Sequence, residues 1–165
     1  MRRDLIRVLD FLDGTAFVQM DVPAGTPFLT DPKFTSVALL EFNKQNQNPP
    51  GYLYHVDKHL QGIIHSPGVT PEQKQLAPQI DTDLNNLNTW LEKMRDDAKQ
   101  LVNMPDAQLL SPNALSILND LVNYANYASE GKNDPNTNQI TGGVLRIHAN
   151  IQRLAAFDVT AYTQQ

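Results

Sequence analysis

A regular seam of apolar residues between positions 80 and 101 constrains the fold of this chain more than any other feature. Seven apolar residues recur there with spacings that alternate between four and three: Ile80, Leu84, Leu87, Leu91, Met94, Ala98 and Leu101. This a/d repeat predicts a long helix that buries one narrow stripe against neighbouring helices. Residues 79–103 would span about 37 Å as a helix, a length that is common in helical bundles.

The start of this helix is marked by Thr-Pro-Glu-Gln at residues 70–73, which matches a capping box with proline at the first helical position. Pro78 lies inside the predicted helix, where it removes one backbone hydrogen bond and its ring clashes with the carbonyl group at position 74. We therefore expect a helix over residues 70–103, with a kink or a brief break near Ala77.

Four shorter segments have the apolar spacing of amphipathic helices. Gly14 is placed to cap the end of the first segment, Ser111 and Pro112 mark the start of the third, Gly131 ends it, and Thr141 is the expected cap of the last. Their apolar positions are Leu5, Ile6, Val8, Leu9 and Leu12; Leu53, Val56, Leu60, Ile63 and Ile64; Leu115, Leu118, Leu121, Val122, Ala125 and Ala128; and Val144, Ile147, Ile151, Leu154 and Phe157.

These stripes predict a mainly α protein. A single chain can bury several amphipathic stripes against one another by folding into an antiparallel helical bundle. Here we expect about four main helices and a short, partly irregular N-terminal segment. The length of 165 residues fits one domain, so we expect residues 1–165 to form a single helical-bundle domain. Residues 15–50 are expected to be an irregular or short α/β segment packed on that bundle.

Two patterns compete within this N-terminal segment. Every second residue from Ala16 to Val22 is apolar, as in a half-buried strand, and residues 34–42 could form a second strand beside it. Alternatively, residues 34–42 form a helix that begins at Asp31 and Pro32. We favour the helix, because an isolated two-stranded hairpin is only marginally stable.

Histidines provide the first candidate site. His55 and His59 are four residues apart in a predicted helix, so both project from one face and could share a divalent transition metal. The third ligand would be His148 or a carboxylate such as Asp57, Asp83 or Asp97. The alternative is that both histidines only form hydrogen bonds or face solvent, since they lie beside the apolar stripe of their helix.

A second candidate is the polar loop over residues 132–139, in which Asp134, Asn136 and Asn138 alternate as oxygen ligands do at the start of a calcium loop. An EF-hand loop starting at Asp134 would need glycine at position 139 and an acidic residue at position 145, where this chain has Gln139 and Leu145. The alternative is a connecting loop rich in turn-forming residues.

Composition excludes several classes of function. The chain has no cysteine, so disulfides, thiolate metal sites and a cysteine nucleophile are ruled out. With 13 basic and 18 acidic residues, the net charge of −5 argues against nucleic-acid binding. The longest aliphatic run, residues 37–40, is far shorter than the roughly 20 residues of a membrane span.

No glycine-rich phosphate loop, Gly-x-Ser-x-Gly elbow or His-Glu-x-x-His sequence occurs in the chain. We therefore predict a non-enzymatic helical-bundle module with an interaction, sensing or structural role. Its partner would be a protein or a second copy that covers the rest of the seam at 80–101. A metal-binding bundle is the alternative. The uncharged polar surface implied by 15 Asn and 13 Gln, without cysteine, favours an exported protein over a cytosolic one.

Overall fold

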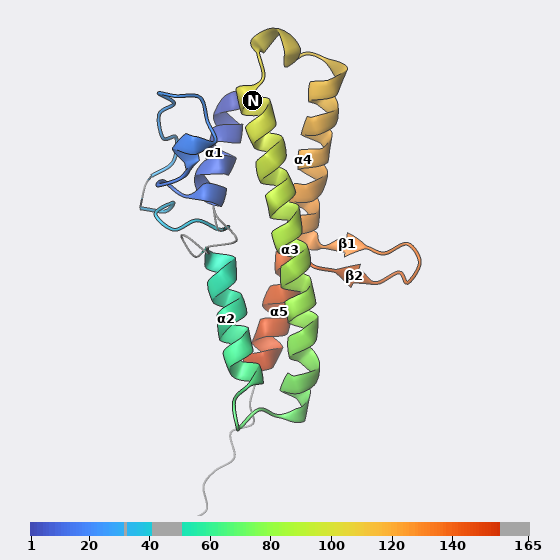
Figure 1. The fold of residues 1–165 in the computed structure, drawn as a ribbon. Helices are drawn as coiled ribbons and strands as arrows, with labels where there is room; N and C mark the ends of the chain where they lie inside the picture. Colours follow the sequence, from blue (N-terminus) through green and yellow to red (C-terminus); the bar gives the residue numbers. More distant parts are fainter. Residues whose placement is uncertain (32, 41–50, 156–165) are drawn as a thin grey trace, which may run out of the picture.

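The computed structural model describes residues 1–31, 33–40 and 51–155, and in this part of the chain it is mainly α (Figure 1). Two strands, β1 (Lys132–Asn133) and β2 (Ile140–Thr141), form a small antiparallel hairpin, and single 3-10 turns lie at Val18–Met20 and Asp106–Gln108. The described α-helices are α1 (Arg2–Asp13), α2 (Tyr52–Ile64), α3 (Pro71–Asn103), α4 (Pro112–Glu130) and α5 (Val144–Ala155).

The predicted long helix is confirmed as α3. Its capping box is formed, since the Gln73 backbone N–H donates to Thr70 Oγ1 at 3.2 Å and the Thr70 N–H donates to Gln73 Oε1 at 3.0 Å. Of the kink or brief break expected near Ala77, the break is absent, because α3 continues through Ala77 and Pro78 without interruption. Ala77 and Ile80 are completely buried, and this packing offsets the one backbone hydrogen bond that Pro78 removes.

Helix α3 is the central element, and the other four helices all pack against it. Figure 1 shows α1 and α4 beside the part of α3 near its end, and α2 and α5 beside the part near its start. Two apolar clusters follow this division: one contains Leu9, Val18, Leu101 and Leu121, and the other contains Leu60, Ile80, Ile147 and Leu154. The antiparallel bundle therefore consists of two levels, each with three helices.

The seam along α3 is covered within the chain. Six of its seven residues are buried, and Met94 is partly buried against the cluster around Ile80. The hypothesis that a second copy is needed to cover the seam at 80–101 is therefore wrong. Any surface that remains for a partner must lie elsewhere on the bundle.

Residues 15–40 differ from both sequence-based alternatives over the described positions. Residues 18–20 form a 3-10 turn instead of a strand, and residues 34–40 form turns and bends instead of a helix or a strand. The backbone pairs with the end of α1: the Thr15 N–H donates to Thr35 O at 2.7 Å, and the Leu40 N–H donates to Leu12 O at 3.1 Å. This arrangement buries Val18 and Leu40 without any sheet. Residues 32 and 41–50 lie outside the described residues.

The last helix begins later than expected. Thr141 belongs to β2 and does not cap α5, because Gly142 and Gly143 form the turn into the helix with φ values of 70° and 82°. The Ile147 N–H accordingly donates to Gly143 O at 3.0 Å. Ile147 and Leu154 are buried as predicted, whereas Val144 is exposed and Phe157 lies outside the described residues.

Each described helix has polar residues on at least one side. Within residues 1–31, 33–40 and 51–155, none of the helices combines the length and the apolar character that crossing a membrane requires.

Candidate functional site

The three histidines of the predicted metal site are all exposed. His55 and His59 lie on α2, and His148 lies on α5. In the described part of the chain, no three His, Asp or Glu side chains gather closely enough to hold a metal ion. Within residues 1–31, 33–40 and 51–155, neither His148 nor a carboxylate joins His55 and His59 in such a group.

His59 instead borders a small apolar hollow of about 230 Å³ between α2, α3 and α5. The other residues that line the hollow are all aliphatic: Val56, Leu60, Ile63, Ile80, Ile151 and Leu154. His65 caps the end of α2, where its Nδ1 lies 2.7 Å from Gln61 O. His55 and His59 are thus exposed on α2, and His59 lies at the edge of its apolar stripe.

The calcium-like loop forms the tip of the β1–β2 hairpin, which projects from the bundle (Figure 1). Asp134 closes this turn itself, since its carboxylate accepts the Asn136 N–H at 2.9 Å and the Thr137 hydroxyl at 3.0 Å. These hydrogen bonds lower the pKa of Asp134. Asn138 adopts a positive φ of 53° and accepts from Asn133 Nδ2 at 3.1 Å. Both carboxylate oxygens of Asp134 are thus used inside the turn.

Helix α4 has two apolar flanks, although the sequence suggested one. The flank that faces α3 consists of Ala114, Leu121 and Ala128, which are buried. Leu115 and Val122, which were predicted on the same face, are 59% and 48% exposed. The prediction that all apolar residues of this helix share one buried face is therefore wrong. The six apolar positions span too wide an arc for one neighbouring helix to cover.

We call the second surface the outward flank of α4. Its residues are mostly three or four positions apart, with Leu118 and Asn119 adjacent, so they lie on one side of the helix. They are Ser111, Leu115, Leu118, Asn119, Val122, Asn126 and Ser129. None of them is charged, and α4 as a whole has only two charged residues, Asp120 and Glu130. Asp120 lies on a different side of α4 from this flank. Burial, as the larger cause, and the charge of Asp120 together raise the pKa of Asp97 on α3.

The outward flank continues into a shallow apolar hollow at the start of α4. This hollow has a volume of about 330 Å³, and Leu109, Leu110, Leu115 and Leu118 border it. Leu110 is 95% exposed, so a large apolar side chain extends into solvent at this end of the bundle. Leu109 and Leu118 are partly buried against the core, so the exposed apolar side chains of this surface are Leu110, Leu115 and Val122. Exposed apolar side chains gathered on one surface mark an interaction site more often than isolated exposed leucines do.

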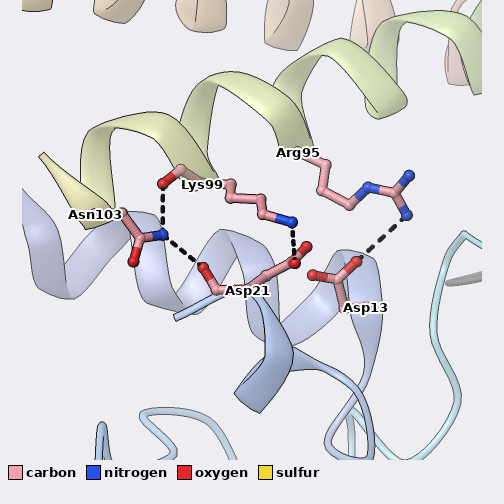
Figure 2. A network of polar contacts seen from close by, with 5 residues as sticks. All are labelled: Asp13, Asp21, Arg95, Lys99 and Asn103. Carbon is pink, nitrogen blue, oxygen red and sulfur yellow. Dashed lines mark hydrogen bonds and ion pairs between the residues drawn. The ribbon is translucent and has the colours of Figure 1, made fainter. Parts of the chain in front are cut away.

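A different feature lies between α1 and α3, where acidic side chains are buried (Figure 2). The carboxyl groups of Asp10, Asp13 and Asp21 are almost completely removed from solvent. Lys99 forms an ion pair with Asp21, and Arg95 Nη1 lies 3.5 Å from Asp13 Oδ1.

Asn103 completes this network. Its Nδ2 donates to the backbone oxygens of Asp21 and Lys99, each at 2.9 Å (Figure 2). The network therefore joins the end of α1 and the 3-10 turn that follows it to three successive turns of α3.

Asp13 has the most strongly shifted pKa of the groups in this cluster. Its side chain is 0% exposed, and its Oδ2 has no hydrogen-bond partner within the described residues. Burial, together with the negative charge of Asp21, raises the pKa of Asp13 to about 7, and the charge of Arg95 opposes this rise only in part. A carboxyl group with this pKa is protonated in acid and ionised above neutral pH.

The burial of these aspartates was not predicted from the sequence. Asp13 follows Leu9 by four residues and so shares the buried face of α1, which is the one local signal that could have indicated burial. The second signal is a group of threonines after α1: Thr30 Oγ1 donates to Asp10 Oδ2 at 3.1 Å, and the Leu29 N–H donates to the same oxygen at 3.1 Å.

Comparison with known proteins identified no relative of this chain. No protein-family model matches the chain, and no curated protein or solved structure matches it significantly.

Proposed function

We propose that this protein is a non-enzymatic helical-bundle interaction module, and that the outward flank of α4 binds a second copy of the same chain. The observation that carries the proposal is the exposure of Leu115 and Val122, seven residues apart, on a helix whose other apolar flank is buried. A spacing of seven residues keeps both side chains on one side of α4 over two turns, as in the seam of a coiled coil.

The chemistry of the flank supports a helix as the occupant. Residues at the centres of protein interfaces are depleted in charge, because burying an unpaired charge is costly. The outward flank has no charged residue from Ser111 to Ser129, so a partner helix can cover it without removing any ion from water. Asn119 and Asn126 provide side-chain amides that both donate and accept hydrogen bonds across such a contact.

The flank is also suited to pairing with itself. In a two-fold antiparallel arrangement, Leu115 of one copy lies near Val122 of the other, and the reverse contact forms at the same time. Asn119 then lies close to the two-fold axis. A polar residue at such a position fixes the register of paired helices, at some cost in stability.

The size of the surface determines how strongly two copies are expected to associate. Helix α4 has 19 residues and is about 28 Å long, so its outward flank alone is smaller than the roughly 800 Å² per partner of a stable interface. The hollow beside Leu110 enlarges the surface at one end. We therefore expect weak, reversible association that becomes visible at high protein concentration.

Because the chain has no cysteine, single introduced cysteines test the geometry directly. Asn119→Cys, near the proposed axis, should form a disulfide-linked dimer under mild oxidation, since two thiols at the axis come within bonding distance. Ala149→Cys, on the exposed surface of α5, is the matched control and should cross-link much more slowly. Adding Leu115→Lys and Val122→Lys to Asn119→Cys should slow cross-linking to the rate of the control. Equal rates for the two single-cysteine proteins would contradict the proposal.

A further inference from the structure

The buried acidic pair of Figure 2, Asp13 and Asp21, lies beside two cations, Arg95 and Lys99. Lys99 forms an ion pair with Asp21, whereas Arg95 Nη1 lies 3.5 Å from Asp13 Oδ1. Ionising both carboxyl groups would place two negative charges side by side in a region with little access to water, which is costly. One bound proton removes that repulsion.

The geometry places this proton on Asp13. Its Oδ2 accepts no hydrogen bond within the described residues, so an ionised carboxylate would leave one buried oxygen unsatisfied. The protonated group can instead donate a hydrogen bond, and the side chains of Asp13 and Asp21 are close enough to share one. Protonation therefore satisfies the buried oxygen and removes the repulsion between the two aspartates in one step.

We propose that Asp13 is a proton-controlled latch: when protonated it holds α1 and the adjoining residues 15–22 against α3, and when ionised it loosens this attachment. The segment it controls is large. The contact between α1 and α3 buries Leu5, Leu9 and Val18 together with Ala98 and Leu101 of α3. Loosening the latch would expose apolar core residues at the end of the bundle that contains α1 and α4.

The neighbouring charged groups are consistent with this assignment. On α3, Glu92 lies one turn before Arg95 on the same side as Lys99. The described residues of the loop over 22–40 add only Asp31 and Lys33, and both are exposed. Within the described residues, the cations that contact the buried carboxyl groups are therefore Arg95 and Lys99.

The direction of the pH effect follows from linkage. The pKa of Asp13 is about 7 in the folded state and 3.8 for an ordinary aspartate, so between these values the docked state binds more protons than the released state. The attachment is thus strongest below about pH 4, weakens as the pH rises toward 7, and stays constant above that. The population of the released state grows by up to about tenfold per pH unit in this range.

Amide hydrogen exchange, corrected for the intrinsic effect of pH, tests the latch in the full-length protein. Between pH 5 and 7, protection of residues 2–22 should fall by up to about 100-fold, while protection of α4 stays constant. Asp13→Asn should abolish the fall, because the amide cannot ionise. Asp4→Asn, an exposed position on the same helix, should behave like the wild type. Protection that is independent of pH in the wild type, or a fall that persists in Asp13→Asn, would overturn the proposal.

A direct titration keeps the test decisive if Asp13→Asn does not fold. In the wild-type protein, the carbon-13 signal of the Asp13 carboxyl group should titrate with a midpoint near pH 7. A midpoint below pH 5 would show that the group is ionised while docked, and the latch would then be excluded.

Discussion

A single buried side chain, Asp83, ties the β1–β2 hairpin and α5 to the central helix. Asp83 Oδ1 accepts a hydrogen bond from the Gly142 N–H at 2.7 Å, and Asp83 Oδ2 accepts one from Arg146 Nε at 2.8 Å. Arg146 also donates to Ile140 O in β2. Asp83 was a possible metal ligand from its sequence position, yet the structure uses both of its oxygens for these hydrogen bonds. The residue therefore has a structural role.

Replacing Asp83 with alanine should destabilise the protein by about 2 kcal/mol, since the buried Gly142 N–H loses its acceptor and Arg146 loses its ion pair. Urea unfolding followed by circular dichroism measures this change as a lower midpoint. Asp96→Ala, an exposed position on the same helix, is the control and should stay within about 0.5 kcal/mol of the wild type. Equal midpoints for the two variants would show that the Asp83 contacts contribute nothing.

At the scale of elements, the hairpin depends on two glycines that connect it to α5. Gly142 has a φ of 70°, and a Cβ at this position would lie 2.5 Å from the ring of Trp90 on α3. No side chain fits there unless the ring moves. Trp90 also packs against Tyr127 of α4, with ring centroids 5.7 Å apart, so the glycine, the tryptophan and the tyrosine form one contact between three elements.

Gly142→Ala should therefore destabilise the protein by about 2 kcal/mol or more, from the strained backbone and the displaced ring together. Trp90 is the only tryptophan in the chain, so its fluorescence reports the displacement directly as a shifted emission maximum. Gly68→Ala is the control, because nothing lies near its Cβ position and its stability should hardly change. An unchanged spectrum for Gly142→Ala would contradict this view of the hairpin.

The helices themselves follow from local sequence. The capping box at Thr70, the cap at Ser111 and the glycine after α1 stand where the pattern predicted them, because each depends on residues within one turn. Alternating apolar residues after Gly14 indicated a strand, but Val18 and Val22 are buried by irregular backbone that follows the end of α1, and Met20 is 66% exposed. The alternation alone does not specify which of these residues become buried or which backbone structure buries them.

The candidate sites depend on contacts between distant residues, and this limits what the sequence predicts. The spacing of His55 and His59 correctly placed them on one helix, but only the fold determines whether a third ligand is near. Asp13 meets Arg95, which lies 82 residues later in the chain, so no local pattern could indicate that these two side chains meet. For α4, the flank that becomes buried is decided by the position of α3, because Leu121 and Val122 are equally apolar.

At the scale of the whole molecule, the division into two three-helix levels explains why one apolar surface remains open. A fourth helix beside α4 would cover Leu115 and Val122, but α2 and α5 pack along the other part of α3. The described part of the chain therefore leaves the outward flank of α4 without a neighbouring helix. A second copy of the protein can supply that helix, and this is the central claim of the account.

Sedimentation equilibrium over a wide concentration range tests this claim most directly. The wild type should show an average mass that rises with concentration from 18.5 kDa toward twice that value. The double variant Leu115→Lys, Val122→Lys should stay monomeric throughout, because two buried charges oppose pairing. Leu145→Lys, which replaces a leucine that is 63% exposed on α5, should associate like the wild type. A wild type that stays monomeric at the highest concentration, or a double variant that associates equally well, would contradict the claim.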